Sequence, residues 1–191
     1  DIYLKGKFSQ YKKGDGSFLT EADMSSHRLI LEGLKKIGLD IPVLSEEGET
    51  ISKRTVEMFW LVDPLDGTRE FIGKNDEFTV NIALIEKGKP VLGVVNAPAK
   101  DELFLGVLGQ GSYRIKKGVS EVITTKDLNK DMLRITLSKS HQSDRDLQFI
   151  EKAKKRFKNI EVIAAGSSLK LCRVAEGNAD IYCRLGPTFQ W

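Results

Sequence analysis

The sequence is poor in cysteine and histidine, the residues that most often build disulfide frameworks and zinc sites. Its 191 residues contain two cysteines, Cys172 and Cys183, and two histidines. Two cysteines cannot form the disulfide framework of a small secreted domain, and their spacing matches no zinc pattern. We therefore predict that both cysteines are buried free thiols.

Long hydrophobic runs are also missing. The longest apolar stretches, residues 58–62 and 91–95, are far shorter than the ~18 residues of a membrane-spanning helix. The chain does not open on a charged and then apolar leader. These features predict a cytoplasmic protein without an integral membrane segment, and they leave peripheral membrane association and the oligomeric state open.

A large charge excess is the third absence. The chain has 30 Lys and Arg against 27 Asp and Glu, a net charge of +3. Proteins that bind nucleic acid usually concentrate a much larger positive excess on one face. The basic residues within 152–158 have no interleaved set of aromatic residues, so we predict a solvated helix face and no nucleic-acid partner.

The hydrophobic rhythm predicts two α/β subdomains. Before residue 130 it indicates a helix from Thr20 to about Gly38, followed by mostly antiparallel strands at 41–44, 57–62, 78–86, 90–97 and 102–108. After residue 130, strands at 134–138, 160–164 and 179–184 alternate with helices at 143–157 and 168–176. We expect an α/β (α+β) fold with an antiparallel-sheet subdomain over residues 1–130 and an α/β subdomain over 131–191.

The segment from Trp60 to Thr68 contains the strongest chemical motif. Asp63 and Asp66 follow an apolar strand, and Pro64 is expected to end that strand so that both carboxylates and the Leu65 carbonyl converge. Three hard oxygen donors suit Mg²⁺. Gly67 and Thr68 are expected to start the next helix, whose N-terminus favours phosphate. The alternative is a turn in which the two aspartates only cap a helix.

Two further acidic motifs precede it. Glu46 and Glu47 follow the strand at 41–44, and Glu46 would lie beside Asp63 if the two strands are neighbours. The alternative is a solvated acidic pair. Asp23, in Thr20-Glu-Ala-Asp, has either a role in the site or the role of a capping-box carboxylate. A calcium loop of the EF-hand type is excluded because position 65 is leucine.

Together these motifs resemble those of the magnesium-dependent, lithium-sensitive phosphatases that include inositol monophosphatases and 3′(2′),5′-bisphosphate nucleotidases. The resemblance rests on the order T-x-A-D, S-E-E and D-P-L-D-G-T, with about 20 residues between motifs, and D-P-L-D-G-T is its specific element. Arg69-Glu70-Phe71 stands where inositol monophosphatases typically have Thr-Asn-Phe, so the sequence looks most similar to the bacterial bisphosphate nucleotidases. The similarity continues through segments 77–95, 138–141, 166–170, 174–182 and 186–191.

The resemblance implies a layered α/β/α/β sugar-phosphatase-like fold and hydrolysis of the 3′-phosphate of adenosine 3′,5′-bisphosphate (PAP), with the sulfated nucleotide PAPS as a further substrate, in sulfur assimilation. It implies two or three Mg²⁺ ions held by Glu46, Asp63, the Leu65 carbonyl and Asp66. Thr68 and Asp23 would orient and deprotonate the attacking water. The implied substrate-binding residues are Glu46, Leu65, Asp66, Gly67, Thr68, Ser138, His141, Gly166 and Lys170. Read without the resemblance, His141 and Lys170 are as easily solvated surface side chains.

The family pattern continues past Trp191 with Asp-Thr-Ala-Ala-Gly, whose aspartate is a further metal ligand. We therefore expect one ligand to lie beyond Trp191, and a chain ending there to bind that ion more weakly; the N-terminus is also expected to be short of most of the family's first helix. The alternatives are an inositol monophosphate or sugar bisphosphate phosphatase and a non-catalytic module that binds nucleotide or metal. A haloacid-dehalogenase interpretation is disfavoured because the nucleophile of that family stands two residues before the second aspartate, and position 64 is proline.

Overall fold

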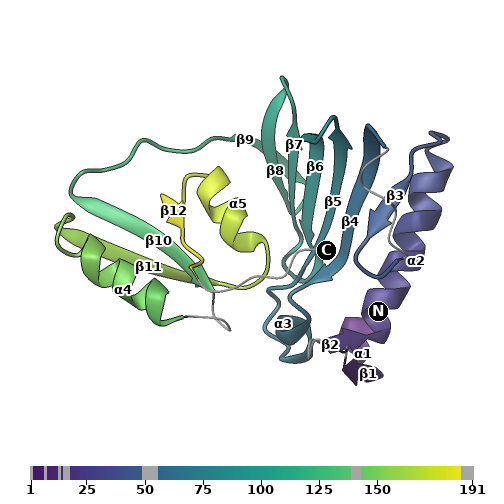
Figure 1. The fold of residues 1–191 in the computed structure, drawn as a ribbon, viewed down its shortest axis with the longest axis horizontal. Helices are drawn as coiled ribbons and strands as arrows, with labels where there is room; N and C mark the ends of the chain where they lie inside the picture. The colour runs from purple at the N-terminus through teal and green to yellow at the C-terminus, as the bar shows by residue number, and fades with distance from the viewer. Residues whose placement is uncertain are drawn as a thin grey trace.

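The computed structural model describes residues 2–6, 8–12, 14, 18–48, 56–138 and 143–185. These residues form one large sheet, one small sheet and the helices that cover them (Figure 1). A small hairpin and a short helix precede the large sheet, and they comprise α1 (Ile2–Lys5), β1 (Gln10–Lys12) and β2 (Phe18–Thr20). In the described part of the chain, no helix has the length and apolar character needed to cross a bilayer.

The large sheet has seven strands in the order β3-β4-β5-β6-β7-β8-β9. Every pair from β4 to β9 is antiparallel, and β3 alone pairs in parallel with its neighbour, β4. The strand bounds are β3 (Val43–Ser45), β4 (Met58–Asp66), β5 (Thr79–Glu86), β6 (Lys89–Ala97), β7 (Glu102–Val107), β8 (Gly111–Lys116) and β9 (Val119–Ile123), with the 3₁₀ turn η1 (Pro98–Lys100) between β6 and β7. The predicted antiparallel meander is therefore confirmed.

The sheet differs from the prediction in two places. β8 and β9 were not predicted, because β9 is mostly exposed and its mixed polar and apolar residues give a weak alternation signal. The expectation that Pro64 ends the strand was wrong, since β4 continues to Asp66. Its pairing with β5 shifts register between Asp63 and Asp66, so Pro64, which has no N–H to donate, lies where the ladder is already interrupted.

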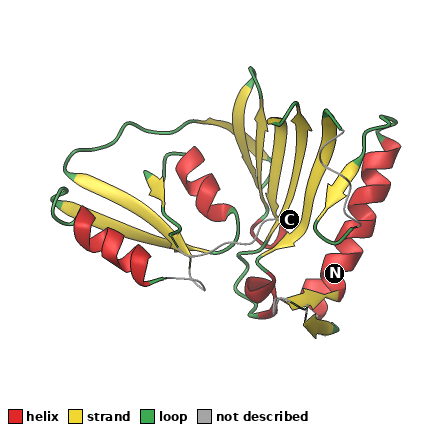
Figure 2. Cartoon of the chain, viewed as in Figure 1, coloured by secondary structure: helices red, strands yellow, loops and turns green. Residues whose placement is uncertain are grey.

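Helix α2 (Glu21–Lys36) covers one face of the large sheet. Its apolar side places Leu34 and Ile30 against Trp60 and Val62 of β4, and these side chains form one of the buried cores. The spacing of apolar residues in the sequence predicted this helix, and the observed end at Lys36 agrees with it. Figure 2 shows α2 on the outer side of the large sheet, with the small sheet on the other side.

The small sheet has three parallel strands in the order β11-β10-β12. Its elements are β10 (Met132–Ser138), α4 (Asp144–Ala153), β11 (Asn159–Ala165), α5 (Leu169–Ala175) and β12 (Ile181–Tyr182). The predicted helix at 143–157 ends earlier, because the chain turns after Ala153 and Phe157 folds back onto the α4–β10 core. The predicted strand at 179–184 is likewise shorter.

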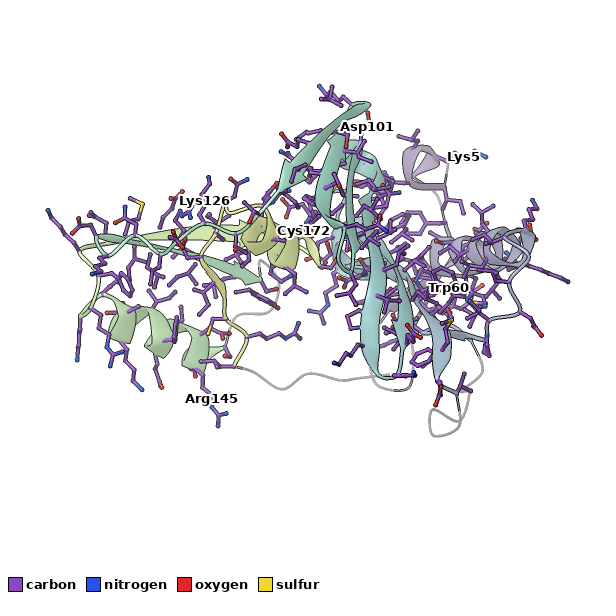
Figure 3. All side chains as sticks on the ribbon, turned by 90° about the horizontal axis from the view of Figure 1, so that it is seen from above. Lys5, Trp60, Asp101, Lys126, Arg145 and Cys172 are labelled. Atoms are coloured by element: carbon purple, nitrogen blue, oxygen red, sulfur yellow. The ribbon has the colours of Figure 1, made fainter. Side chains whose placement is uncertain are left out.

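Helix α5 lies between the two sheets. Its Leu169 and Cys172 pack on Ala97 and Phe104 of the large sheet, while its other side contacts β10. Helix α4 packs through Ile150 on the opposite face of the small sheet. The layers therefore run α2, large sheet, α5, small sheet, α4, and Figure 3 shows Cys172 in the layer between the sheets. The expected layered α/β fold is confirmed, with α4 as an additional outer layer.

The chain passes from one sheet to the other through residues 124–131, which contain no helix or strand. The division that we propose between residues 130 and 131 falls at the end of this connection. Both cysteines are buried free thiols, as predicted, with Cys172 on α5 and Cys183 in the α4–β10 core.

Candidate active site

The first acidic motif lies at the ends of two neighbouring strands. β3 and β4 are parallel, and Ser45 is paired with Val62. The backbone N–H of Glu46 donates to the Val62 carbonyl at 3.0 Å, so the backbone of Glu46 is still hydrogen-bonded to β4. Glu46 and Asp63 therefore leave the same edge of the sheet side by side, as the sequence predicted.

The second motif is shaped by the interrupted β4–β5 ladder. Asp63 accepts a hydrogen bond from the backbone N–H of Leu65 at 3.1 Å, which closes a tight turn around Pro64. The Pro64 carbonyl accepts a bond from the Ser26 hydroxyl of α2 at 2.8 Å. Pairing with β5 resumes at Asp66, opposite Thr79. The turn and the α2 contact together fix the backbone between the two aspartates.

Burial and mutual repulsion dominate the electrostatics of this motif. Burial, followed by the charges of Asp66 and Glu46, raises the pKa of Asp63 to about 8, and its carboxyl group shares a hydrogen bond with that of Glu46. Burial also raises the pKa of Asp66, although Lys170 and the backbone of Ser168 oppose the shift. Acidic groups that repel in this way are stabilised by protons or by a cation.

The donor set fits Mg²⁺ in its chemistry, since it offers carboxylates and a backbone carbonyl. Glu46 and Asp63 are already together, whereas Asp66 accepts its hydrogen bond from Ser168 of the small-sheet side. Among the described residues, no three or more Asp, Glu, His or Cys side chains are gathered tightly enough to hold an ion as they stand. Asp66 nevertheless acts on Asp63, because its charge raises the pKa of Asp63.

The chain after Asp66 forms the predicted helix start. Gly67 adopts a left-handed conformation with φ of 89°, and α3 (Thr68–Ile72) begins directly after it. The start of α3 has no side-chain cap, so the alternative in which Asp63 and Asp66 only cap this helix is wrong. Thr68 is the first residue of α3, as expected.

Asp23 forms the capping box that the sequence allowed. Its Oδ2 accepts bonds from the Thr20 backbone N–H at 2.7 Å and the Thr20 hydroxyl at 2.5 Å. Burial raises the pKa of Asp23, the Thr20 bonds oppose that shift, and the charge of Glu47 adds to it. The adjacent Ala22 packs against Leu65, which brings the start of α2 to the acidic motif. A capping role and a role in the site are therefore compatible at this position.

The second subdomain contributes its strand ends to the same region. Ser138 and Ala165 are paired at the carboxyl ends of the parallel strands β10 and β11, which places Ser138 beside Gly166. Carboxyl ends of parallel strands are the usual place for ligands in α/β proteins. Figure 1 shows both ends directed toward the part of the large sheet from which α3 follows.

Two glycines allow the subdomains to approach closely there. The Gly166 N–H donates to Glu77 Oε2 at 2.8 Å, and a Cβ at Gly166 would lie 2.7 Å from the Glu77 carbonyl oxygen. A Cβ at Gly67 would lie 3.2 Å from that of Ser167. Gly166 was predicted as a substrate contact, and the structure shows in addition that its missing side chain permits this approach.

Lys170 points inward. It is 5% exposed, and its ammonium group donates to the Ser167 carbonyl at 2.5 Å and lies 5.6 Å from the centre of the Tyr182 ring. Burial lowers the pKa of Lys170, and the charge of Asp66 opposes that shift. The alternative of a solvated surface lysine is wrong, and its contact with substrate phosphate remains a prediction. His141 lies outside the described residues.

Several residues of this region were missed by sequence reasoning. The Ser168 hydroxyl bonds to Thr79 Oγ1 at 2.8 Å and donates to Asn81 Oδ1 at 2.7 Å, which ties the start of α5 to β5. His27 Nδ1 lies 2.8 Å from the Ser45 hydroxyl. Ser26 and His27 follow Asp23 by three and four residues, so helical spacing could have identified them. The α5 contacts have no such local signal.

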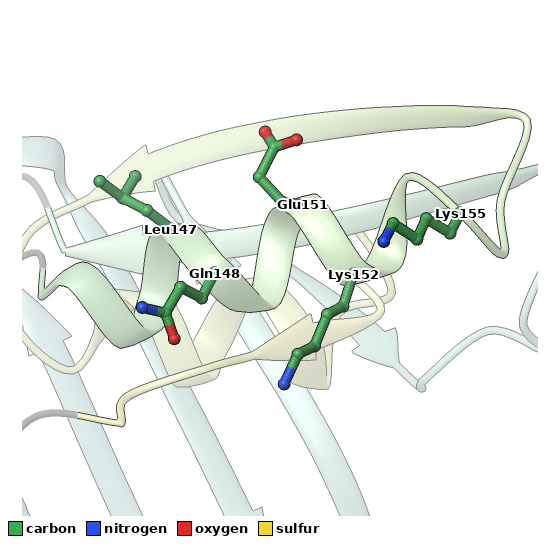
Figure 4. Close-up of a pocket in the computed structure, with 5 residues that line it drawn as sticks. All are labelled: Leu147, Gln148, Glu151, Lys152 and Lys155. Atoms are coloured by element: carbon green, nitrogen blue, oxygen red, sulfur yellow. The ribbon is translucent and has the colours of Figure 1, made fainter.

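The basic run after residue 151 lies far from this region. Its basic side chains are exposed, as predicted, but only Lys152 lies on α4, because the helix ends at Ala153. Figure 4 shows Lys152 on α4 and Lys155 just after it. A shallow hollow of about 390 Å³ lies among them and Glu151. It is a surface feature of one helix and adds no residue to the candidate site.

Comparison with known proteins agrees with the geometry. The model of the inositol monophosphatase family matches residues 3–191. The 3′(2′),5′-bisphosphate nucleotidase CysQ of Salmonella typhimurium is 42% identical over 193 aligned positions, which cover 100% of this chain and 76% of that protein.

Solved structures share the fold. CysQ from Bacteroides thetaiotaomicron, described as a bacterial member of the inositol monophosphatase family, superposes with a TM-score of 0.79 at 40% identity, covering 88% of this chain and 68% of that one. An IMPase/NADP phosphatase complexed with Mg²⁺ and phosphate superposes with a TM-score of 0.74 at 18% identity, over 92% of this chain and 65% of that one. The second likeness shows the fold alone.

Proposed function

This chain belongs to the inositol monophosphatase family, and from that premise we propose that it is a Mg²⁺-dependent 3′(2′),5′-bisphosphate nucleotidase that hydrolyses the 3′-phosphate of PAP to give AMP and phosphate. The supporting observation is the meeting of Glu46 and Asp63 at the ends of parallel strands, with Asp66 three residues further along the same strand. The 42% identity to the Salmonella nucleotidase over the whole chain supports the same substrate class.

Glu46, Asp63, the Leu65 carbonyl and Asp66 would hold Mg²⁺ at this edge of the sheet. Bound there, Mg²⁺ would act as a Lewis acid that stabilises the charge on the phosphate oxygens. The geometry that supports this role is the tight turn at Pro64, which is fixed by Ser26, and the shared hydrogen bond between Glu46 and Asp63. Two or three ions, as the family resemblance implies, belong to the same proposal.

Thr68 and Asp23 would orient the attacking water and accept its proton. Asp23 suits this role because its raised pKa brings a carboxylate nearer to the pH range in which a general base works well. Ser138, Gly166 and Lys170 would contact the nucleotide from the second subdomain. Their support is the meeting of the β10 and β11 carboxyl ends with the Asp66 region through Ser168 and Glu77.

The direct experiment is phosphate release from PAP by the intact protein, with and without Mg²⁺, in the wild type, Asp66→Ala and Asp127→Ala. Asp127 is an exposed acid in the connection between the sheets, and it is a matched control for loss of one carboxylate. We expect Mg²⁺-dependent release that Asp66→Ala loses and Asp127→Ala keeps. Equal rates for Asp66→Ala and the wild type would contradict the proposal.

A second experiment compares candidate substrates. We expect kcat/KM for PAP to exceed the values for inositol 1-phosphate and fructose 1,6-bisphosphate, and AMP to be the nucleotide product. A higher kcat/KM for inositol 1-phosphate would instead assign the chain to the monophosphatase branch. Tight nucleotide binding without turnover would favour a non-catalytic module.

A further inference from the structure

A buried cluster of charged residues lies between the large sheet and α5, apart from the candidate active site. Glu102, the first residue of β7, is 1% exposed. It accepts hydrogen bonds from Arg114 Nε of β8 at 2.6 Å and from Arg173 Nη2 of α5 at 2.9 Å. One carboxylate of the sheet is thus bonded to a strand neighbour and to the helix above it.

A second acid completes the connection from the helix side. Glu176, directly after α5, pairs with Arg173 and lies 3.4 Å from Arg114 Nε. Burial works to raise the pKa of Glu102, yet its hydrogen bonds to the two arginines hold that pKa below its ordinary value. The arginines therefore compensate the buried Glu102, in contrast to the repelling acids at the β3 and β4 ends.

The same helix contributes groups to the Asp66 region at its other end. Ser168 precedes α5, its backbone donates to Asp66, and its hydroxyl is bonded to Thr79 and Asn81 of β5. Lys170 lies in the first turn of α5, and its positive charge is the largest influence that opposes the rise in the pKa of Asp66 caused by burial. Arg173 follows Lys170 by three residues, so about one helical turn separates the arginine from the site.

Apolar packing alone would not set the position of α5 along its axis. Leu169 and Cys172 pack on Ala97 and Phe104, and contacts of this kind have no preferred direction. The guanidinium of Arg173 has a fixed planar shape, so its bonds to Glu102 and Glu176 define both the rotation and the axial position of the helix.

We propose that Glu102 is a positioning residue for the active site: by holding Arg173, it sets the position of α5 and so the placement of Ser168 and Lys170 against Asp66. This inference rests on the proposed function, because it treats Asp66 as a member of the catalytic machinery. Glu102 itself touches neither substrate nor the reacting atoms.

The experiment compares Glu102→Gln with Glu121→Gln in the intact protein. Glu121 pairs with the same Arg114 at 3.0 Å, but its side chain is 55% exposed, so it is a matched control at the rim of the cluster. We expect Glu102→Gln to raise the Mg²⁺ concentration for half-maximal activity by about tenfold and to lower kcat, with KM for PAP changed less than twofold. Glu121→Gln should stay within about twofold of the wild type in all three values.

Alkylation of the two cysteines by iodoacetamide, followed by peptide mass spectrometry, reports on α5 without any activity. Cys172 lies on α5, where burial raises the pKa of its thiol to about 12, while Cys183 lies in the α4–β10 core. A buried thiol is labelled when its surroundings open. We expect Glu102→Gln to label Cys172 about tenfold faster than the wild type and to leave the Cys183 rate unchanged.

The outcomes separate the inference from the proposed function. Faster labelling of Cys172 alone, together with a higher Mg²⁺ concentration for half-maximal activity, supports the positioning role. Equal acceleration at both cysteines means general destabilisation and overturns it, as does an unchanged Mg²⁺ response in Glu102→Gln. If Glu102→Gln does not fold, Arg173→Lys, which keeps the charge and loses the planar fork, takes its place with the same expectations. Absence of phosphate release by the wild type would overturn the proposed function instead.

Discussion

Two groups of buried acids in this chain have pKa values that are shifted in opposite directions. At the ends of β3 and β4, Glu46, Asp63 and Asp66 repel one another, and the pKa of Asp63 is raised to about 8. At the start of β7, Glu102 is more deeply buried, yet hydrogen bonds to Arg114 and Arg173 hold its pKa below the ordinary value. Burial acts on both groups, but Glu102 has arginine partners whereas the neighbours that act on Asp63 are acids.

The difference separates a site from a structural connection. A buried carboxylate that is hydrogen-bonded to arginines has its charge compensated within the protein, and its removal leaves those arginines with fewer acidic partners. Acids that are left to repel are costly for the folded state unless a cation binds among them. We therefore assign the β3–β4 acids to chemistry and the Glu102 cluster to the placement of α5.

The largest expected effect is on catalysis and comes from Asp63→Asn. Replacing a carboxylate that would bind Mg²⁺ should lower kcat/KM for PAP by more than about a hundredfold, since metal stabilisation of the transition state is worth several kcal/mol. The same change relieves repulsion, so the denaturation midpoint without Mg²⁺ should rise. Steady-state kinetics and thermal denaturation check the two parts, and a lower midpoint would contradict the contrast between the clusters.

For Glu102→Ala we expect a loss of stability, in contrast to the gain expected for Asp63→Asn. Its removal takes away the hydrogen bonds that Glu102 accepts from Arg114 and Arg173 and leaves Glu176 as the remaining acid between them. This loss should lower the free energy of unfolding by about 1.5–3 kcal/mol. Urea denaturation measures this loss. Glu121→Ala, at the exposed rim, should cost less than about 1 kcal/mol, and equal losses for the two variants would remove the distinction between centre and rim.

A smaller effect is expected where the subdomains meet. A methyl group at Gly166 would lie 2.7 Å from the Glu77 carbonyl oxygen and the Glu70 Cγ, so Gly166→Ala should cost about 1–3 kcal/mol through overpacking. Gly33 is an exposed α2 position with open space around it, and Gly33→Ala should stabilise by about 0.5–1 kcal/mol. Denaturation of both variants tests whether the close approach is required.

The smallest expected effect is on how the stability of the second subdomain changes as the pH falls. Burial works to raise the pKa of Asp180, but hydrogen bonds from Arg134 hold it below the ordinary value. The stabilisation is therefore present above the unfolded-state pKa of about 4 and is lost as pH falls through the lower folded-state pKa. Asp180→Asn should reduce the loss of stability between pH 5 and 3 by on the order of 1 kcal/mol, measured from denaturation midpoints against pH.

The β3–β4 side could be predicted from sequence because its chemistry is local. Asp63, Leu65, Asp66 and Gly67 lie within five consecutive residues, and an apolar strand before them fixes their direction. Placing Glu46 beside Asp63 required one further assumption, that β3 and β4 are neighbours, and the observed register confirmed it. The error at Pro64 came from treating proline as a strand end, although a register shift accommodates it.

The α5 side could not be predicted in the same way. Ser168 meets Thr79 and Asn81 across almost ninety residues of sequence, and Glu102 meets Arg173 across 71. No periodicity links residues so far apart, because their contact depends on how α5 lies between the sheets. The family resemblance predicted Lys170 and Gly166 as site residues, but it gave no sign of the Glu102 cluster that we propose positions the helix.

The most direct measurement of the central claim is the shift of the thermal denaturation midpoint on adding Mg²⁺. A ligand that binds only the folded state stabilises it by about 2.7 kcal/mol at a hundred times its Kd. We predict that Mg²⁺ raises the midpoints of the wild type and Glu121→Gln, and that it leaves the midpoint of Asp63→Asn unchanged. A Mg²⁺-induced rise in Asp63→Asn equal to that of the wild type would contradict the assignment of the β3–β4 acids to the cation.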